Sequence, residues 1–326
     1  IEKRAFGGGG TGVWLGGLVG DNWLGPVPAC IVDACTELRI PSIRLTEGIL
    51  VQLGDGAAQH RVWTAETDTT SAIAEGISRD KDLTKQLLQS CGVPVPEGRI
   101  VESPEDAWEA AEDIGLPVVV KPSDGNHGRG VSTELMTRVD VEAAFKLADE
   151  EGSEVIVERF IRGNEHRLLI VGGKLAAAAR GESVSVIGDG VSTIRHLIDL
   201  QVNTDPRRGE AEEFPLEPLL IDETPSVIFE IKRQGYAPDS VLPKETSIIV
   251  QRNGNVAIDV TDLVHPEVAA MAALAARIVG LDIAGIDMVA EDISRPLAEQ
   301  EAAIVEVNAG PGLLMHLKPA QGEARP

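Results

Sequence analysis

The amino-acid sequence predicts an α+β or α/β fold with two or three subdomains. From Asp80 onwards, amphipathic helical segments alternate with short apolar strands, and turns that contain Gly or Pro separate them. The 326 residues are too many for one simple core, and 43% of hydrophobic residues is enough to form more than one. Residues 1–76 differ, since they are rich in Gly and carry Trp14, Trp23 and Trp63, so we expect a small N-terminal segment before the main fold.

Two helices are predicted from their boundary residues. Asp80 is a favourable N-cap, and the helix after it is expected to end at Gly92. Ser103, with a proline behind it, begins a second helix that ends at Gly115. The apolar face expected for the first helix consists of Leu83, Leu87, Leu88 and Cys91.

The later elements follow from apolar periodicity and turn residues. Strands are predicted at 118–121, near 131, at 155–160, at 168–171 and, after a Gly-Gly turn, towards 180. Helices are predicted through 141–148, over 193–202 and from 266 to 280, and two further strands at 281–289 and 303–308. The Pro- and Glu-rich segment 205–225 is expected to be a solvated excursion.

Composition excludes several classes of function. The chain has 29 basic and 52 acidic residues, and a formal charge of −23 argues against nucleic acid or an anionic membrane as partner. The cysteines Cys30, Cys35 and Cys91 have neither the count nor the spacing of a disulfide framework or a zinc site. The apolar stretch near the start is interrupted at Asp21, well short of the ~20 residues that a membrane helix needs. We therefore expect a cytoplasmic protein without a membrane partner.

Three polar residues in apolar strands predict a Mg²⁺ site. Side chains alternate along a strand, so Glu306 and Asn308 should share one face while Ala303, Val305 and Val307 pack on the other. A buried carboxylate needs a partner, and oxygen donors suit Mg²⁺. The third ligand is available as Asp287, which lies in the middle of the 281–289 strand. The alternative is that all three are ordinary polar residues at strand ends.

A Gly-rich loop after Lys121 is a candidate phosphate cradle. The three glycines of residues 123–131 would let backbone N–H groups approach a phosphate chain closely, although a Gly-rich hairpin turn would have a similar sequence. His127 in this loop and His166 further along are interpreted as local hydrogen bonders.

The order of these features resembles the ATP-grasp family. The turn Asn308-Ala309-Gly310-Pro311-Gly312 matches the family's N-x-x-P-G sequence. The resemblance implies two α+β subdomains that grip ATP, with Asp287, Glu306 and Asn308 as the Mg²⁺ ligands. The nucleotide-binding residues that it implies are Lys81, Lys121, Gly125, His127, Gly128, Arg129, Gly130, Glu158, Ile161 and Glu165. Glu158 and the backbone to Ile161 would face adenine, and Glu165 the ribose.

Phosphoryl transfer also needs guanidinium groups around the transferred phosphate. Arg167 and Arg180, on neighbouring predicted strands, are the candidate catalytic pair. The alternative for either arginine is a surface ion pair.

A more specific resemblance, to the ATP-grasp half of the cyanophycin synthetase family, extends over nearly the whole chain. It is carried by the stretches 64–68, 80–85, 124–131, 205–209, 259–266 and 289–296. It implies that residues 1–76 are the remnant of a preceding domain, 77–318 the ATP-grasp domain, and 319–326 a tail or linker to an absent Mur-ligase-like domain. It also implies a lid subdomain at about 118–160 and an excursion at about 190–250. One departure is the short segment between Asn253 and Asp259, which puts substrate contacts there in doubt.

These features predict an ATP-dependent carboxylate–amine ligase that acts through an acyl phosphate. The resemblance implies that it adds aspartate to a peptide or polymer primer and that the full-length enzyme is a homo-oligomer. The alternatives are an amino-acid ligase of the glutathione synthetase type and a catalytically silent ATP-binding fragment.

Overall fold

A computed structural model describes residues 24–123, 130–151, 154–209, 214 and 216–326 of the chain. The candidate loop residues Gly125, His127, Gly128 and Arg129 lie outside these described residues. The chain divides into two compact units, residues 1–68 and residues 69–326. None of the helices in the described part is long and apolar enough to cross a membrane.

The first unit contains a small antiparallel sheet. Its strands lie in the order β1-β2-β3-β4, each paired with the next along the chain. Its elements are α2 (Pro26–Glu37), β1 (Ser42–Arg44), β2 (Leu50–Leu53), η1 (Gly56–Ala58), β3 (His60–Trp63) and β4 (Glu66–Thr67).

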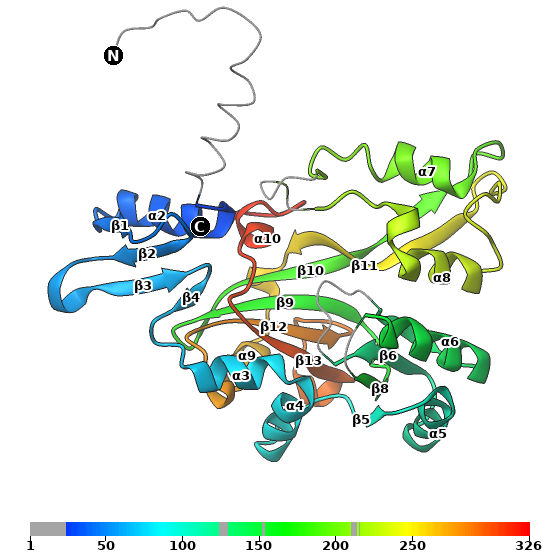
Figure 1. Cartoon of the computed structure of the whole chain (residues 1–326), viewed down its shortest axis with the longest axis horizontal. Coiled ribbons are helices and arrows are strands. Elements are labelled where there is room, and N and C mark those ends of the chain that lie inside the picture. The colour runs from blue at the N-terminus through cyan, green and yellow to red at the C-terminus, as the bar shows by residue number, and fades with distance from the viewer. Residues whose placement is uncertain (1–23, 124–129, 152–153, 210–213, 215) are drawn as a thin grey trace, which may run out of the picture. The chain divides into compact units, whose positions relative to one another are not determined.

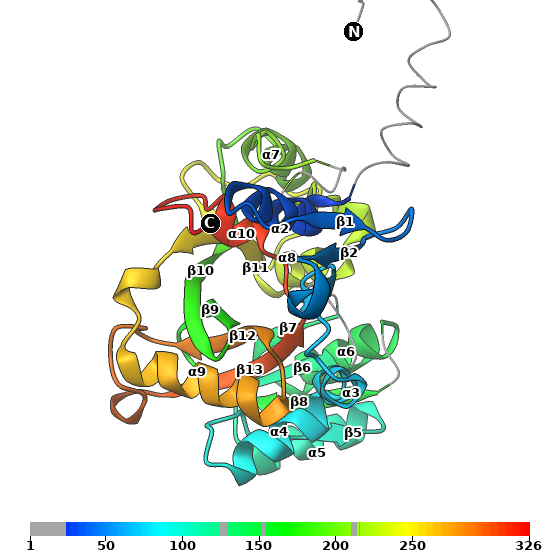
Figure 2. The same ribbon diagram turned by 90° about the vertical axis from the view of Figure 1, so that its left-hand side faces the viewer.

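The second unit is built on an antiparallel sheet with the order β11-β10-β9-β12-β13 (Figure 1). These strands are β9 (Asn164–Val171), β10 (Lys174–Ile187), β11 (Ser247–Asp259), β12 (Ile283–Ala290) and β13 (Ala302–Ala309). Helices α3 (Ala72–Arg79), α4 (Lys81–Ser90) and α9 (Pro266–Val279) run beside this sheet (Figure 2). Their apolar faces form one core with even-numbered residues of β9 such as Leu168 and Ile170. The odd-numbered residues of β9 therefore face away from this core.

A second layer, hereafter the lid, runs from β5 to β8 and contains most of the segment at about 118–160 for which a lid is predicted. The sheet β5-β8-β6-β7 is covered by two helices, and Ala110 of α5 and Ala144 of α6 are fully buried in its core. The elements are β5 (Gly98–Val101), α5 (Pro104–Ile114), β6 (Val118–Pro122), β7 (Ser132–Leu135), α6 (Arg138–Asp149) and β8 (Val155–Arg159). Strand β8 continues through Gly163 into β9, and a Cβ atom at Gly163 would overlap the Ala290 carbonyl. Only glycine therefore fits where the lid joins the main sheet.

The segment 205–225 differs from its sequence expectation. Leu219 and Ile221 are buried in a third core with the ends of β10 and β11. This part adds α7 (Ile194–Gln201), η2 (Ile221–Glu223) and α8 (Pro225–Arg233), and the chain closes with η3 (Thr261–Leu263), η4 (Leu297–Glu299) and α10 (Leu314–Leu317). The expectation rested on Pro and Glu content, but apolar residues between the charges supply a core of their own.

The helix boundaries predicted from capping residues are confirmed. The Asp80 carboxylate accepts a hydrogen bond from the Leu83 N–H at 2.9 Å, and the Ser103 hydroxyl from the Asp106 N–H at 3.1 Å. Gly280 ends α9 in the left-handed region, with φ +91°. These local interactions are independent of tertiary packing, which is why sequence alone predicts them.

An ion cluster centred on the buried Glu230 joins α8 and β11 to the lid. Glu230 of α8 is 7% exposed and accepts hydrogen bonds from Arg233 at 3.2 Å and from Arg252 of β11 at 3.0 Å. Arg252 also donates to the Glu134 carboxylate of β7 at 2.7 Å, and Arg233 donates to the backbone carbonyls of Thr133 and Glu134 at 2.9 and 2.8 Å. The cluster therefore fixes the strand that follows the Gly-rich loop.

We predict that Glu230→Ala lowers the free energy of unfolding by about 3–5 kcal/mol, because it leaves two guanidinium groups without their shared carboxylate. Urea denaturation measures this change. Glu223→Ala, at an exposed position of the same segment, is the matched control and should change the stability by less than about 0.5 kcal/mol. Equal stability of the two variants would show that the cluster does not hold the lid.

Candidate functional site

The face of the main sheet opposite its core carries a row of charged residues. Asp287 at the centre of β12 pairs in register with Arg167 of β9 on one side and with Glu306 of β13 on the other. Two nitrogens of the Arg167 guanidinium group donate to the Asp287 carboxylate. Nε donates to Oδ1, and Nη2 donates to Oδ2 at 2.9 Å. Asn308 donates to the same carboxylate oxygen at 3.1 Å. The structure thus brings together the three predicted Mg²⁺ ligands and one of the two predicted arginines.

A bulge in β13 changes the predicted alternation of faces. The register shifts between Asp287 and Met288, so that Glu306 pairs with Asp287 while Ile304 pairs with Met288. Ile304 and Val307 both pack into the core, and Val305 is only partly buried. The prediction that Ala303, Val305 and Val307 share one face is therefore wrong, because the extra residue reverses the alternation. Glu306 and Asn308 nevertheless remain beside Asp287.

Gly285 makes room for Arg167. It lies two residues before Asp287, and a Cβ atom there would be 2.8 Å from the Pro311 side chain and 3.3 Å from Cδ of Arg167. The first distance is shorter than van der Waals contact allows. A larger residue would therefore move either the turn after β13 or the arginine.

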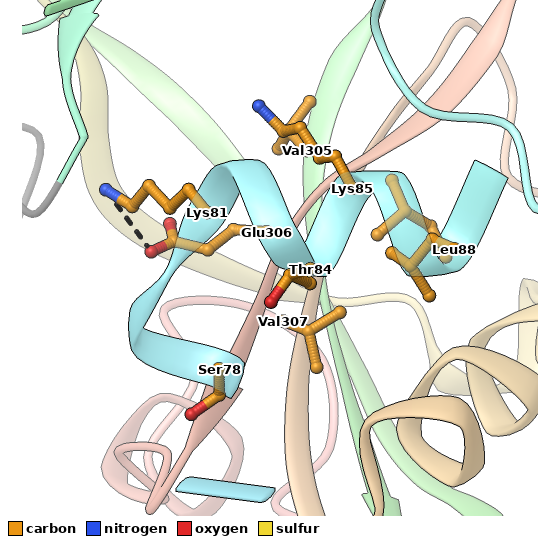
Figure 3. Close-up of a pocket in the computed structure, with 9 residues that line it drawn as sticks. Ser78, Lys81, Thr84, Lys85, Leu88, Val305, Glu306 and Val307 are labelled. Atoms are coloured by element: carbon orange, nitrogen blue, oxygen red, sulfur yellow. Dashed lines mark ion pairs between the residues drawn. The ribbon is translucent and has the colours of Figure 1, made fainter. Parts of the chain in front are cut away.

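Helix α4 buries a different face from the one predicted. Leu83 is 39% exposed and Cys91 is exposed, whereas Lys81 and Thr84 are buried together with Leu88. The Lys81 ammonium lies 3.5 Å from Glu306 Oε1 (Figure 3). The prediction failed because it assigned burial by hydrophobicity, and a lysine can be buried when a carboxylate on a neighbouring strand balances its charge.

Lys85, one turn after Lys81 on the same helix, was not among the predicted site residues (Figure 3). Its side chain is 11% exposed and forms an ion pair with Glu158 Oε1. Lys121, from the end of β6, lies 2.9 Å from the other oxygen, Oε2. Burial lowers the pKa of both lysines. The i, i+4 spacing of Lys81 and Lys85 is the signal that could have identified it.

Arg180 is not brought to Arg167. The β9–β10 register pairs Arg167 with Ala179 and Arg180 with His166, so the two arginines project from opposite faces of the sheet. Arg180 instead forms an ion pair with Glu182 at 3.3 Å, at the surface. A one-residue difference in register decides the face, and the sequence does not specify the register.

The remaining predicted residues in the described part are Glu165, Ile161 and Gly130. Glu165 is on the same face of β9 as Arg167, and burial together with the charge of Asp287 raises its pKa to about 7. Burial also raises the pKa of Asp287, with Arg167 opposing this shift. Ile161 is 9% exposed in the segment between β8 and β9, and Gly130 has φ +67°.

The donor set fits Mg²⁺ bound together with phosphates. No group of three or more His, Cys, Asp and Glu side chains able to hold a metal occurs within the described residues. Two carboxylates and one amide are nevertheless the kind of partial oxygen set with which proteins bind Mg²⁺, whose other ligands are waters and substrate phosphates. Four cationic side chains, Lys81, Lys85, Lys121 and Arg167, lie in the same region as four carboxylates, those of Glu158, Glu165, Asp287 and Glu306. The site is therefore close to electrically neutral.

Known proteins resemble this chain at the level of sequence and of structure. Residues 80–171 match the family described as "Carbamoyl-phosphate synthase L chain, ATP binding domain". The chain is 42% identical over 310 residues to the cyanophycin synthetase of Synechocystis sp.. This alignment covers 93% of this chain and 35% of that protein. It is 31% identical over 287 residues to the glutathione biosynthesis bifunctional protein GshAB of Clostridium perfringens. This alignment covers 84% of this chain and 36% of that protein.

Among solved structures, a bifunctional glutathione synthetase from Pasteurella multocida has a TM-score of 0.61 and 26% sequence identity to this chain. The match covers 94% of this chain and 43% of that protein. The chain spans about a third of the length of the curated relatives named above.

We predict that Glu165 makes the nucleotide-free protein less stable as the pH rises. Its pKa is about 7 in the folded state against an ordinary 4.5, so the folded state binds the proton more tightly. The resulting stability is fully present below pH 4.5 and is lost as the pH rises through about 7. Thermal unfolding in chelator should show Glu165→Gln gaining stability over wild type between pH 5 and 8.

The exposed Glu105→Gln variant is the matched control and should follow the wild-type pH dependence. Identical curves for wild type and Glu165→Gln would mean that Glu165 is not desolvated by its neighbours.

Proposed function

The chain belongs to the ATP-grasp proteins and is homologous to one region of the cyanophycin synthetases, and from this premise we propose that it uses ATP to join a carboxylate to an amine. The observation that carries the proposal is the pairing of charges on the face of the main sheet opposite its core. Each predicted Mg²⁺ carboxylate is neutralised by a cationic side chain suited to phosphate, Asp287 by Arg167 and Glu306 by Lys81.

This pairing supports nucleotide binding by exchange of partners. Asp287, Glu306 and Asn308 would hold Mg²⁺, which would supply positive charge beside the phosphates and the two carboxylates. Arg167 and Lys81 then become available to phosphate oxygens on the same face. The buried charges remain compensated in both states, so the exchange avoids the cost of an unpaired ion.

The residues of the chain have separate tasks in the proposed reaction. Lys81 and Lys121 hold the phosphates of ATP, and Gly130 ends the loop that would cover them. Arg167 stabilises the acyl phosphate formed when the substrate carboxylate takes the γ-phosphoryl group. Attack by the amine then forms the amide and releases phosphate. Glu158 and Ile161 border the proposed adenine site, and Glu165 the ribose site.

The similarity to cyanophycin synthetases supports an amino acid and a peptide primer as substrates, and the sequence resemblance implies that the amino acid is aspartate. The cyanophycin synthetases match 93% of the chain at 42% identity, so we propose that the carboxylate belongs to a peptide or polymer primer and the amine to aspartate. The second candidate is a glutathione synthetase-type ligase. It is favoured by the match to the Pasteurella multocida structure over almost the whole chain. The two differ in the amine that they accept, so the amino acid that stimulates phosphate release separates them.

Phosphate release from Mg-ATP, measured with short cyanophycin-like primers and each amino acid in turn, tests the proposal. We expect release only when primer and aspartate are both present. Asp287→Asn and Glu306→Gln should each lower the rate by at least about 100-fold, because each removes a charge that holds Mg²⁺. The exposed Asp149→Asn is the matched control.

Full activity in either carboxylate variant would overturn the metal assignment. Release with another amine in place of aspartate would overturn the substrate assignment, and no release under any combination would favour a catalytically silent module.

Primer affinity should also depend on salt more strongly than ATP affinity. The chain carries a formal charge of −23, which attracts a polymer bearing many arginines over a longer range than a single contact does. Salt screens exposed charges over a Debye length of about 8 Å at physiological ionic strength. Titrations of primer and of an ATP analogue at low and high salt measure the difference. A primer affinity that does not change with salt would contradict electrostatic attraction.

A further inference from the structure

Glu158 is held by two lysines from different elements, and this arrangement suggests a role for Lys85. Glu158 is 2% exposed, and each of its two carboxylate oxygens has its own ammonium partner. Lys85 of α4 pairs with Oε1, and Lys121 of β6 lies 2.9 Å from Oε2. One buried carboxylate is therefore shared between two lysines whose side chains are only 11% and 12% exposed, although a single lysine would neutralise it.

Lys85 has a role as a second partner of Glu158 if Lys121 has to leave that carboxylate. In the proposed function, Lys121 holds phosphate, and it lies near the end of β6, shortly before the Gly-rich loop in the sequence. To contact phosphate it must give up at least part of its interaction with Glu158. A buried carboxylate that loses its partner is strongly unfavourable, so without Lys85 the pair of Lys121 and Glu158 would resist nucleotide binding.

We propose that Lys85 is a positioning residue that keeps Glu158 paired and in place while Lys121 moves from Glu158 to the phosphates of ATP. The inference rests on the proposed nucleotide-binding function and adds a residue that this function did not include. Lys85 acts through Glu158 and makes no contact with the nucleotide. Lys81, one turn earlier, differs because it is paired with Glu306 at the predicted metal site, 3.5 Å away.

The position of Lys85 supports this role over that of a direct phosphate ligand. Its side chain lines the small hollow between α4 and β13, which Leu88 and Val305 also line (Figure 3). Because its ammonium group is committed to Glu158 and its side chain is 11% exposed, it has little freedom to reach a second partner. The lysine that precedes the Gly-rich loop in the sequence is Lys121.

Calorimetric titration with a non-hydrolysable Mg-ATP analogue tests the proposal without requiring catalysis. Lys85→Met should raise the dissociation constant by at least about tenfold, because Lys121 is then the only partner of a buried carboxylate. Lys85→Arg keeps a cation at this position and should recover most of the affinity. Lys146→Met, on the exposed side of α6, is the matched control and should bind as the wild type does.

A double-mutant cycle separates positioning from direct contact and from a general structural effect. In a Glu158→Gln background there is no carboxylate to hold, so adding Lys85→Met should change the dissociation constant by less than about twofold. Equal losses in both backgrounds would mean that Lys85 binds the nucleotide itself, which overturns the proposal. If Lys85→Met does not fold, two other variants provide the same comparison. Lys85→Gln removes the lysine charge alone, and the Lys85→Met/Glu158→Gln double variant removes both charges.

The outcome for the wild type distinguishes this inference from the function on which it rests. If the wild type does not bind the analogue, the proposed function fails and this inference fails with it. If the wild type binds and Lys85→Met binds equally well, only the role of Lys85 is overturned.

Discussion

The ion pair between Arg167 and Asp287 is the interaction on which the candidate site depends. It joins β9 to β12 on the face of the main sheet opposite its core, and Asn308 of β13 binds the same carboxylate. Asp287 would otherwise be a buried charge without a partner, which proteins rarely retain. The pair therefore explains how a carboxylate can stand in the middle of an apolar strand before any metal is bound.

The other charges of the candidate site are also paired with opposite charges, and the helix and sheets of the fold position the partners. Glu306 is paired with Lys81 of α4, and Glu158 with Lys85 and Lys121, so the site draws cations from one helix and from two separate sheets. In each case a buried charge is compensated across a junction between elements. A site of this kind is preorganised for charge exchange, since phosphates and a divalent cation can replace partners without leaving a charge unpaired.

Much of the fold was predictable because its signals are local. Capping residues such as Asp80 and Ser103 bind their own helices, and apolar periodicity identified most strands of the two larger sheets, although β5 and β11 were not predicted. The errors have a common cause in long-range packing. Helix α4 buries Lys81 because Glu306 lies opposite it, and the segment 205–225 buries Leu219 because β10 and β11 extend beneath it. Neither partner is a neighbour in sequence.

The sequence by itself determined the chemistry of the candidate site. It identified the polar residues in apolar strands, Asp287, Glu306 and Asn308, and the lysines at the ends of predicted elements, because residue type and strand period are local properties. Only the tertiary structure decided which of these residues meet. Strand register placed Arg167 beside Asp287 and turned Arg180 to the other face, and the docking of α4 brought in Lys85. Register and docking depend on contacts between segments more than 70 residues apart, such as Lys85 with Glu158, and no local pattern in the sequence encodes them.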